Sequence, residues 1–194
     1  MFDSYQVIFL AFTYLVGAIP TGYWFAKFFF NIDVTQLGSG NIGATNIARV
    51  LGKRYFILIF FIDAGKAFLT LYLANCFVSQ TDMFMFSCAV LLLLGNAYSI
   101  FLTFKGGKGV ATSLGILCFL LPVTWVCVFI ALWLSVLLIF KEVFIASLSA
   151  ALCITFGYAI WFGATNVFYF LIFICLWLIT RHHQNISLFL TTKK

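Results

Sequence analysis

Three polar clusters interrupt an otherwise apolar chain, and each carries side chains suited to phosphate. The first cluster, residues 38–46, reads GSGNIGATN and is followed by Arg49. Its glycines allow backbone N–H groups to approach a ligand, its Ser, Thr and Asn side chains donate hydrogen bonds, and the Arg49 guanidinium matches phosphate in two-point contact. The pattern predicts an anion site, and the alternative is a polar loop whose Asn and Ser side chains cap the next helix.

The second cluster is the run KGGKG at residues 105–109, which leads into an apolar segment that begins at Val110. Glycine-rich backbone at a helix N-terminus, with Lys105 and Lys108 beside it, is a physical anion site. The run does not have the GxxxxGK[ST] spacing of a nucleotide P-loop, so ATP and GTP are not predicted as ligands. The alternative interpretation is a basic anchor that contacts lipid headgroups.

The third cluster, RHHQN at residues 181–185, follows the last apolar segment. An Arg, two imidazoles and an amide can bind phosphate or move a proton, whereas a terminal basic tail is also a common orientation signal. A metal site is not predicted, because adjacent histidines point different ways on a helix and no Asp, Glu or Cys lies near. Outside the clusters, Asp63 and Lys66 can meet on one helical face, as either a functional or a structural pair.

The segments between the clusters are long and apolar enough to cross a membrane. Of 194 residues, 64% are hydrophobic and 8% charged, whereas a soluble domain has about a quarter charged residues. A span needs about 20 apolar residues. Three segments satisfy this, namely 5–30, 55–79 and 83–104. The runs 110–140 and 143–179 are interrupted at Pro122 and at residues 163–166, and we divide each into two spans. The predicted fold class is an all-α integral membrane protein with seven transmembrane helices, or five as the alternative.

The positions of Lys and Arg predict the orientation of this fold. With seven spans, the following residues all lie on one side of the membrane: Arg49, Lys53, Arg54, Lys105, Lys108, Lys141, Arg181, Lys193 and Lys194. Because Lys and Arg are enriched on the cytoplasmic side, the N-terminus is predicted outside and the C-terminus in the cytoplasm. Five spans would change only the side of Lys141. The net charge of +6 is thus assigned to orientation and to anionic substrates, and no nucleic-acid partner is predicted.

Taken in chain order, GSGNIGATNIARVLGK, FKGGKGVATSLG and RHHQNI resemble the three signature motifs of the PlsY family of acyl-phosphate:glycerol-3-phosphate acyltransferases. The run GAIPTGYWFAK is similar to the first span of that family, so the resemblance covers nearly the whole chain. It implies one transmembrane acyltransferase domain over residues 1–194, in the bacterial inner (cytoplasmic) membrane, with its active site facing the cytoplasm. The implied reaction transfers a fatty acyl group from acyl phosphate to the 1-hydroxyl of glycerol 3-phosphate. Its products are lysophosphatidic acid and phosphate, in the first step of phospholipid synthesis, and no metal or other cofactor takes part.

The resemblance also implies a role for individual residues. The residues at the family's catalytic positions are Ser39, Arg49, Lys108, His182 and Asn185. The residues implied in substrate binding are Asn41, Gly43, Thr45, Asn46, Lys105, Gly106, Gly107, Gly109 and Arg181. In the implied mechanism the cationic groups hold the phosphates while the hydroxyl attacks the acyl carbonyl, and its proton passes to the substrate phosphate or to His182. Membrane lipid and an enzyme that produces acyl phosphate are the further implied partners.

Three positions depart from the family pattern. Asn96 follows Gly95 where the family usually has His, Ser99 stands near a usual Pro, and residues 192–194 read TKK in place of the expected Gly-Thr-Glu ending. The alternatives are therefore a catalytically altered family member, a non-catalytic scaffold or a small-solute membrane transporter, since transport sites also have glycine-broken helices and buried charges. The chain contains no second copy of GSGNIGATN or KGGKG, which argues against the inverted repeats of a transporter.

Overall fold

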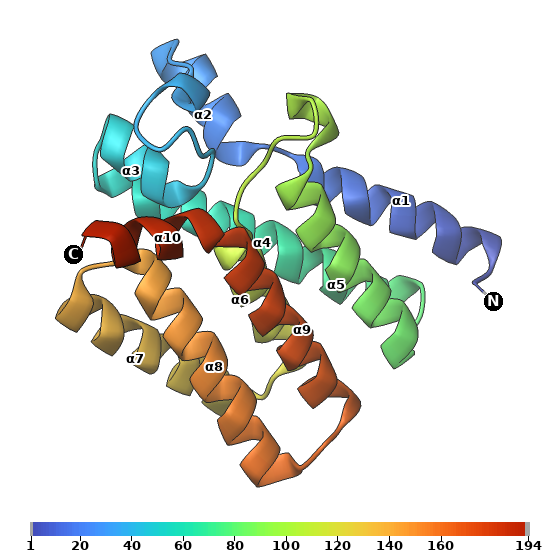
Figure 1. The fold of residues 1–194 in the computed structure, drawn as a ribbon. Coiled ribbons are helices and arrows are strands. Elements are labelled where there is room, and N and C mark those ends of the chain that lie inside the picture. The colour runs from blue at the N-terminus through green and yellow to red at the C-terminus, as the bar shows by residue number, and fades with distance from the viewer. Residues whose placement is uncertain (1, 193–194) are drawn as a thin grey trace. The chain divides into compact units, whose positions relative to one another are not determined.

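The computed structural model describes residues 2–192, and within them every side chain except that of Thr192. The departures from the family pattern at Lys193 and Lys194, and the use of these lysines as orientation signals, lie outside the described residues. The chain divides into two compact units, one that ends at Phe119 and one that begins at Leu120. Both are helical, as Figure 1 shows.

The first unit holds the first two clusters. Its elements are α1 (Ser4–Ala18), α2 (Thr21–Phe30), the 3₁₀ helix η1 (Val34–Gln36), α3 (Ala44–Leu51), α4 (Arg54–Phe77), α5 (Asp82–Ala97), the 3₁₀ helix η2 (Ile100–Leu102) and α6 (Val110–Leu120), whose last residue opens the second unit. Helix α1 lies along α5, and α4 packs against both of them and against α3. Helix α6 also packs on α4, since a Cβ atom at Gly115 would lie 2.1 Å from Ala64 O.

The first apolar segment is not one straight helix. The sequence predicts a span over residues 5–30, but the helix breaks between Ala18 and Thr21, and α1 and α2 are bent by 48°. Pro20 explains the break, because proline has no N–H to donate to the preceding turn and its ring clashes with that turn. The break therefore directs α2 away from the axis of α1 (Figure 1).

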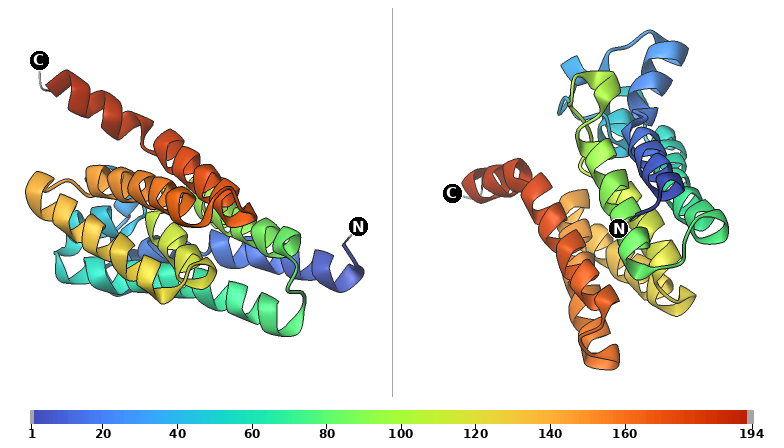
Figure 2. Two further views of the ribbon diagram at one scale, coloured as in Figure 1. Left: turned by 90° about the horizontal axis from the view of Figure 1, so that it is seen from below. Right: turned by 90° about the vertical axis from the view of Figure 1, so that its right-hand side faces the viewer.

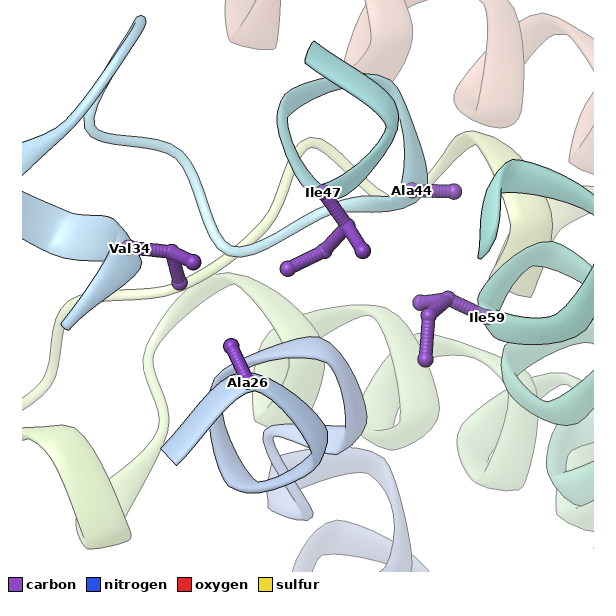
Figure 3. Close-up of a cluster of buried hydrophobic side chains, with 5 residues drawn as sticks. All are labelled: Ala26, Val34, Ala44, Ile47 and Ile59. Atoms are coloured by element: carbon purple, nitrogen blue, oxygen red, sulfur yellow. The ribbon is translucent and has the colours of Figure 1, made fainter. Parts of the chain in front are cut away.

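A small apolar core fixes α2, α3 and the chain between them. Figure 3 shows its five buried side chains, which are Ala26, Val34, Ala44, Ile47 and Ile59. They come from α2, η1, α3 and α4, so this core joins the elements on both sides of the first cluster to the start of α4. The polar loop is thus anchored from beneath by burial of apolar area, the dominant favourable term in folding.

The second unit is a set of helices in which the third cluster lies between the last two. It contains α7 (Val123–Phe140), α8 (Val143–Phe162), α9 (Asn166–Arg181) and α10 (His183–Thr192). Helix α8 packs against α7 on one side and against α9 on the other. The chain bends by 55° between α9 and α10, and the third cluster occupies this bend. The right-hand view of Figure 2 shows the change of direction.

Helix lengths agree with a membrane protein of several spans. In the described part of the chain, α4, α7 and α8 are each long and apolar enough to cross a membrane, and up to five spans result if each bent pair counts as one. Helices α5 and α6 are apolar but shorter, with 16 and 11 residues. The segment predicted as 83–104 is helical only to Ala97, because residues 98–109 turn back on themselves. The count of seven spans and the orientation remain predictions.

Candidate active site

The first cluster forms a tight, exposed loop between η1 and α3. Gly38 and Gly40 have φ values of +61° and +68°, a region that side chains with a Cβ atom rarely occupy. Ser39 lies exposed between them. The two glycines therefore let the chain reverse direction on either side of the Ser39 hydroxyl.

Asn46, at the start of α3, holds this loop together. Its Oδ1 accepts a hydrogen bond of 2.8 Å from Ser39 N, and its Nδ2 donates to Val34 O at 3.1 Å and to Leu37 O at 3.0 Å. The side chain is 1% exposed. An amide that is this buried and this fully paired is a structural clamp. The substrate-binding role predicted for Asn46 is therefore replaced, in our interpretation, by control of the backbone at Ser39.

Arg49 lies next to the loop. A Cβ atom at Gly38 would lie 3.2 Å from Arg49 Cδ, so the arginine side chain runs directly past Gly38. Both Arg49 and Thr45 are exposed, one turn apart on α3. A guanidinium and two hydroxyls, those of Thr45 and Ser39, are thus presented by a single compact segment, and all three groups are suited to phosphate oxygens.

An amide side chain and a carboxylate stabilise turns on either side of Ser39. Asn41 Oδ1 accepts a hydrogen bond of 2.9 Å from Gly43 N. Upstream, Asp33 accepts from Thr35 Oγ1 at 2.6 Å and from Thr35 N at 2.9 Å. The hydrogen bond from the Thr35 hydroxyl, followed by that from its backbone N–H, lowers the pKa of Asp33 below its ordinary value, so the carboxylate is charged near neutral pH.

The second cluster packs directly on the end of α5. Gly107 N donates a hydrogen bond of 2.8 Å to Asn96 O. A Cβ atom at Gly106 would lie 2.1 Å from Asn96 O, and one at Gly107 would lie 2.9 Å from Asn96 Oδ1. Only glycine permits so close an approach between two backbone segments. The glycines of the KGGKG run therefore have a packing role that the sequence pattern did not reveal.

The same cluster leads into the N-terminus of α6. Gly109 has φ +85° and is followed by Val110, the first residue of α6. Lys105 is exposed and lies in an isolated bridge with Ser99, while Lys108 is partly buried. The N–H groups of a helix start, preceded in the chain by two lysines, form an electropositive segment that favours anions.

Buried polar atoms lie beside this glycine-rich run. Among the described side chains, Asn96 Oδ1, Thr112 Oγ1 and Ser113 Oγ are buried without a hydrogen-bond partner. Asn96 is 8% exposed and is the residue that departs from the usual His of the family. Buried polar groups without partners are uncommon and call for an explanation, such as water or a ligand.

The third cluster belongs to the second unit. His182 is 2% exposed, and its Nδ1 lies 2.8 Å from Leu178 O. Since a carbonyl oxygen only accepts, Nδ1 carries the proton, and Nε2 is the nitrogen that accepts in the neutral ring. His183 is exposed, with its Nδ1 2.9 Å from Thr180 O, whereas Arg181 and Asn185 are partly buried. The two imidazoles thus differ in environment, and the buried one is oriented by backbone.

The predicted residues divide between the two units. Ser39, Arg49 and Lys108 lie in the first unit, and His182 and Asn185 lie in the second. Sequence patterns did not single out Asp33, whose carboxylate stabilises the turn before the first cluster through its two hydrogen bonds from Thr35. A short Asp-x-Thr spacing before a glycine-rich turn is the signal that could have found it, because Asp side chains commonly bond the backbone two residues ahead.

Comparison with known proteins gives a consistent result. The family model described as glycerol-3-phosphate acyltransferase matches residues 7–192. Proteins named glycerol-3-phosphate acyltransferase from Staphylococcus haemolyticus and Wolbachia pipientis subsp. Culex pipiens are 40% and 37% identical to this chain. The first aligns over 93% of this chain and 92% of its own length, and the second over 94% and 93%.

Solved structures agree with the sequence relatives. Two crystal structures of PlsY, an integral membrane glycerol 3-phosphate acyltransferase, superimpose with TM-scores of 0.88 and 0.86 at 33% identity. Each covers 98% of this chain and 94% of the other chain, and they represent a glycerol 3-phosphate form and a lysophosphatidic acid form. The family model and these relatives extend over almost the full length of the sequence, and the chain therefore belongs to the glycerol-3-phosphate acyltransferase family of which PlsY is a member.

Proposed function

We propose that this chain transfers a fatty acyl group from acyl phosphate to the 1-hydroxyl of glycerol 3-phosphate, giving lysophosphatidic acid and phosphate. The acyltransferase activity follows from the family, and the acyl phosphate donor is our more specific proposal. The observation that carries the proposal is the packing of Arg49 against Gly38, which puts a guanidinium beside the loop that presents Ser39. A reaction between two phosphorylated substrates requires anion-binding groups of this kind.

The proposed chemistry is a single acyl transfer. The C1 hydroxyl oxygen of glycerol 3-phosphate forms a bond to the acyl carbonyl carbon, and the bond from that carbon to the phosphate oxygen breaks. The hydroxyl proton goes either to a phosphate oxygen of the substrate or to His182 Nε2. Cations held near the phosphates stabilise the negative charge that collects on the departing phosphate.

Individual residues receive the following proposed roles. Arg49 and Lys108 bind phosphate oxygens, and the Ser39 hydroxyl and the N-terminus of α6 donate further hydrogen bonds. His182 and Asn185 take part through polar contacts with the substrates or through proton movement. The remaining predicted substrate-binding residues are assigned to the same polar surroundings, namely Asn41, Gly43, Thr45, Lys105, Gly106, Gly107, Gly109 and Arg181.

The proposal also concerns the cellular setting. We infer a single catalytic domain over residues 1–194 in the bacterial inner membrane, with glycerol 3-phosphate reaching the site from the cytoplasm. Acyl phosphate carries a long apolar chain, so it partitions into the bilayer. A separate enzyme that produces acyl phosphate is the further proposed partner. The Lys and Arg pattern described above supports this orientation.

The test is product formation by the purified protein in detergent, given palmitoyl phosphate and glycerol 3-phosphate. Lysophosphatidic acid and phosphate are measured for the parent and for the Arg49→Ala and Arg54→Ala variants. Arg54 is a matched control, because it is the same residue type and is not one of the predicted site residues. It begins α4, where its guanidinium lies 4.7 Å from the Tyr55 ring centroid. We expect product from the parent and from Arg54→Ala, and a loss of at least about a hundredfold in kcat/KM for Arg49→Ala.

A second donor separates the two levels of the proposal. Palmitoyl-coenzyme A is offered in place of palmitoyl phosphate under the same conditions. Product only with palmitoyl phosphate supports the donor assignment, and product only with the thioester contradicts it while leaving acyl transfer intact. A folded parent that forms no product with either donor contradicts the activity itself and favours a catalytically altered family member.

A further inference from the structure

The break between α1 and α2 leaves backbone carbonyl groups outside the helical hydrogen-bond ladder. In a membrane-embedded helix such groups are costly unless the protein itself satisfies them. Lys66 Nζ, from α4, donates a hydrogen bond of 2.8 Å to Ile19 O. Ser99 Oγ, which follows α5, donates one of 2.5 Å to Ala18 O. Side chains from two other segments therefore supply hydrogen-bond donors to the carbonyl groups at the break.

A carboxylate balances the charge that Lys66 brings to the break. Asp63 Oδ1 lies 2.8 Å from Lys66 Nζ, and both side chains are about one-tenth exposed, at 10% and 11%. The same carboxylate oxygen accepts a hydrogen bond of 2.9 Å from Thr21 Oγ1. The ion pair thus forms hydrogen bonds on both sides of the break, with Ile19 before it and with Thr21 after it.

The residue that follows Thr21 is in contact with the first cluster. Gly22, the next residue, is so close to this cluster that a Cβ atom on it would lie 2.2 Å from Ile42 O and 3.0 Å from Ile47 Cγ1. The first turn of α2 therefore rests on the backbone within residues 38–46. We therefore expect a shift of Thr21 relative to α4 to displace the loop that presents Ser39.

The same break also reaches the second cluster. Ser99, which bonds Ala18 O, forms an isolated bridge with Lys105, and its own carbonyl accepts a hydrogen bond of 2.8 Å from Phe104 N. The turn that precedes the KGGKG run is thereby tied to the end of α1. Contacts at the break between α1 and α2 therefore reach the backbone of both clusters in the first unit.

From these contacts we propose that Asp63 and Lys66 are positioning residues for acyl transfer: they fix the break between α1 and α2, and through Thr21 and Gly22 they set the geometry of the first cluster. This inference rests on the proposed function for its kinetic consequence. A buried ion pair is often no more stable than a well-packed apolar pair of the same size. Stability alone therefore does not account for an ion pair whose hydrogen bonds all lead to the break.

The test is the double variant Asp63→Leu with Lys66→Met, which removes both charges and leaves neither unpaired. We expect the purified double variant to remain folded, with kcat/KM lowered roughly tenfold to a hundredfold and KM for glycerol 3-phosphate raised. Lys66→Arg, which keeps a charged donor, is expected to retain more activity than Lys66→Met. The matched control is Thr13→Val, because Thr13 is buried on α1 and its hydroxyl bonds Phe9 O in the same helix. It is expected to behave as the parent.

Hydrogen exchange provides a readout that does not need activity. The amides of residues 38–47 are expected to exchange faster in the double variant than in the parent and in Thr13→Val. Parent-like exchange and kinetics in the double variant overturn the inference. An inactive parent contradicts the proposed function, and the exchange result then decides the inference alone. If the double variant does not accumulate, Thr21→Val replaces it, since it removes the hydroxyl that bonds Asp63 Oδ1 at nearly constant size, and the same two outcomes apply.

Discussion

Asn46 and Thr45 are adjacent polar residues of the first cluster with opposite structural fates. Thr45 is exposed, whereas Asn46 is buried and its amide contacts Ser39 N and two carbonyl oxygens of residues 34–37. From spacing alone both are candidates for phosphate contact. The distinction arises because η1 folds back over the start of α3, and this contact cannot be inferred from residue types.

Replacing Asn46 with aspartate tests the clamp with almost no change in shape. The carboxylate introduced by Asn46→Asp still accepts from Ser39 N, but it has no donors for Val34 O and Leu37 O. Oxygen would then face oxygen in a buried position, and we expect a loss of roughly 2–5 kcal/mol in the local or global free energy of unfolding. The measurement is thermal unfolding in detergent, together with hydrogen exchange over residues 34–47.

Asn41→Asp is the matched control for this prediction. Asn41 Oδ1 accepts from Gly43 N, and a carboxylate oxygen can do the same. We expect unfolding and exchange close to those of the parent. Equal behaviour of the two aspartate variants would contradict the clamp and would return Asn46 to the set of candidate ligands.

The backbone conformation of the glycines in the candidate site was predictable from residue types, but the local partners of its side chains were not. Glycine at residues 38, 40 and 109 has positive φ, as a glycine-rich phosphate loop requires. The burial of His182 and its bond to Leu178 O follow from the bend between α9 and α10, which a terminal basic run does not reveal. A sequence motif thus proposes candidate residues, and the fold decides which of their polar groups remain available.

At the scale of elements, hydropathy predicted most helices within a few residues. The segment predicted as 55–79 is α4 (Arg54–Phe77), and the divisions at Pro122 and at residues 163–166 separate α6 from α7 and α8 from α9. The segment 5–30 was predicted as one span, and the structure divides it into α1 and α2, which are long and apolar enough together but bent by 48°. Apolar composition does not report breaks in the backbone ladder, although Pro20 was a visible signal for one.

Close packing between α1 and α5 is a property of the elements that can be tested by one methyl group. A Cβ atom at Gly95 would lie 2.3 Å from Tyr14 O and 2.7 Å from Ala18 N. Backbone atoms in packed helices cannot yield easily, so Gly95→Ala is expected to lower the free energy of unfolding by about 1–3 kcal/mol. Thermal unfolding can be followed with a maleimide dye as the additional reaction of the buried thiols, among them Cys88 on α5, above the signal of the exposed Cys76, Cys127 and Cys153.

Gly65→Ala provides the matched comparison on α4. Gly65 is exposed, and a Cβ atom there would have nothing within 4 Å outside its own helix. Alanine is the better helix former, so we expect a gain of about 0.5–1 kcal/mol. If Gly95→Ala is as stable as Gly65→Ala, then α1 and α5 are not in the backbone contact described here.

At the scale of the whole molecule, the distribution of charge determines how the chain threads the membrane. Helices α7 and α8 have 18 and 20 residues and are joined at Lys141 and Glu142, so both can cross and the turn between them lies at one surface. Helix α6, with 11 residues, is about 17 Å long and short for a hydrocarbon core of about 30 Å. Whether α6 crosses the membrane decides the side on which the Lys141 turn lies.

Labelling of a single engineered thiol distinguishes seven spans from five. We expect Glu142→Cys, which keeps Lys141, to react with a membrane-impermeant maleimide only after the cells are permeabilised, because Lys141 belongs with the other cations on the cytoplasmic side. Asp82→Cys, at the first residue of α5, is expected to react in intact spheroplasts, and the parent with its six native cysteines gives the background. Reaction of Glu142→Cys in intact spheroplasts, with Asp82→Cys unchanged, would mean that the turn lies outside and would contradict the seven-span arrangement.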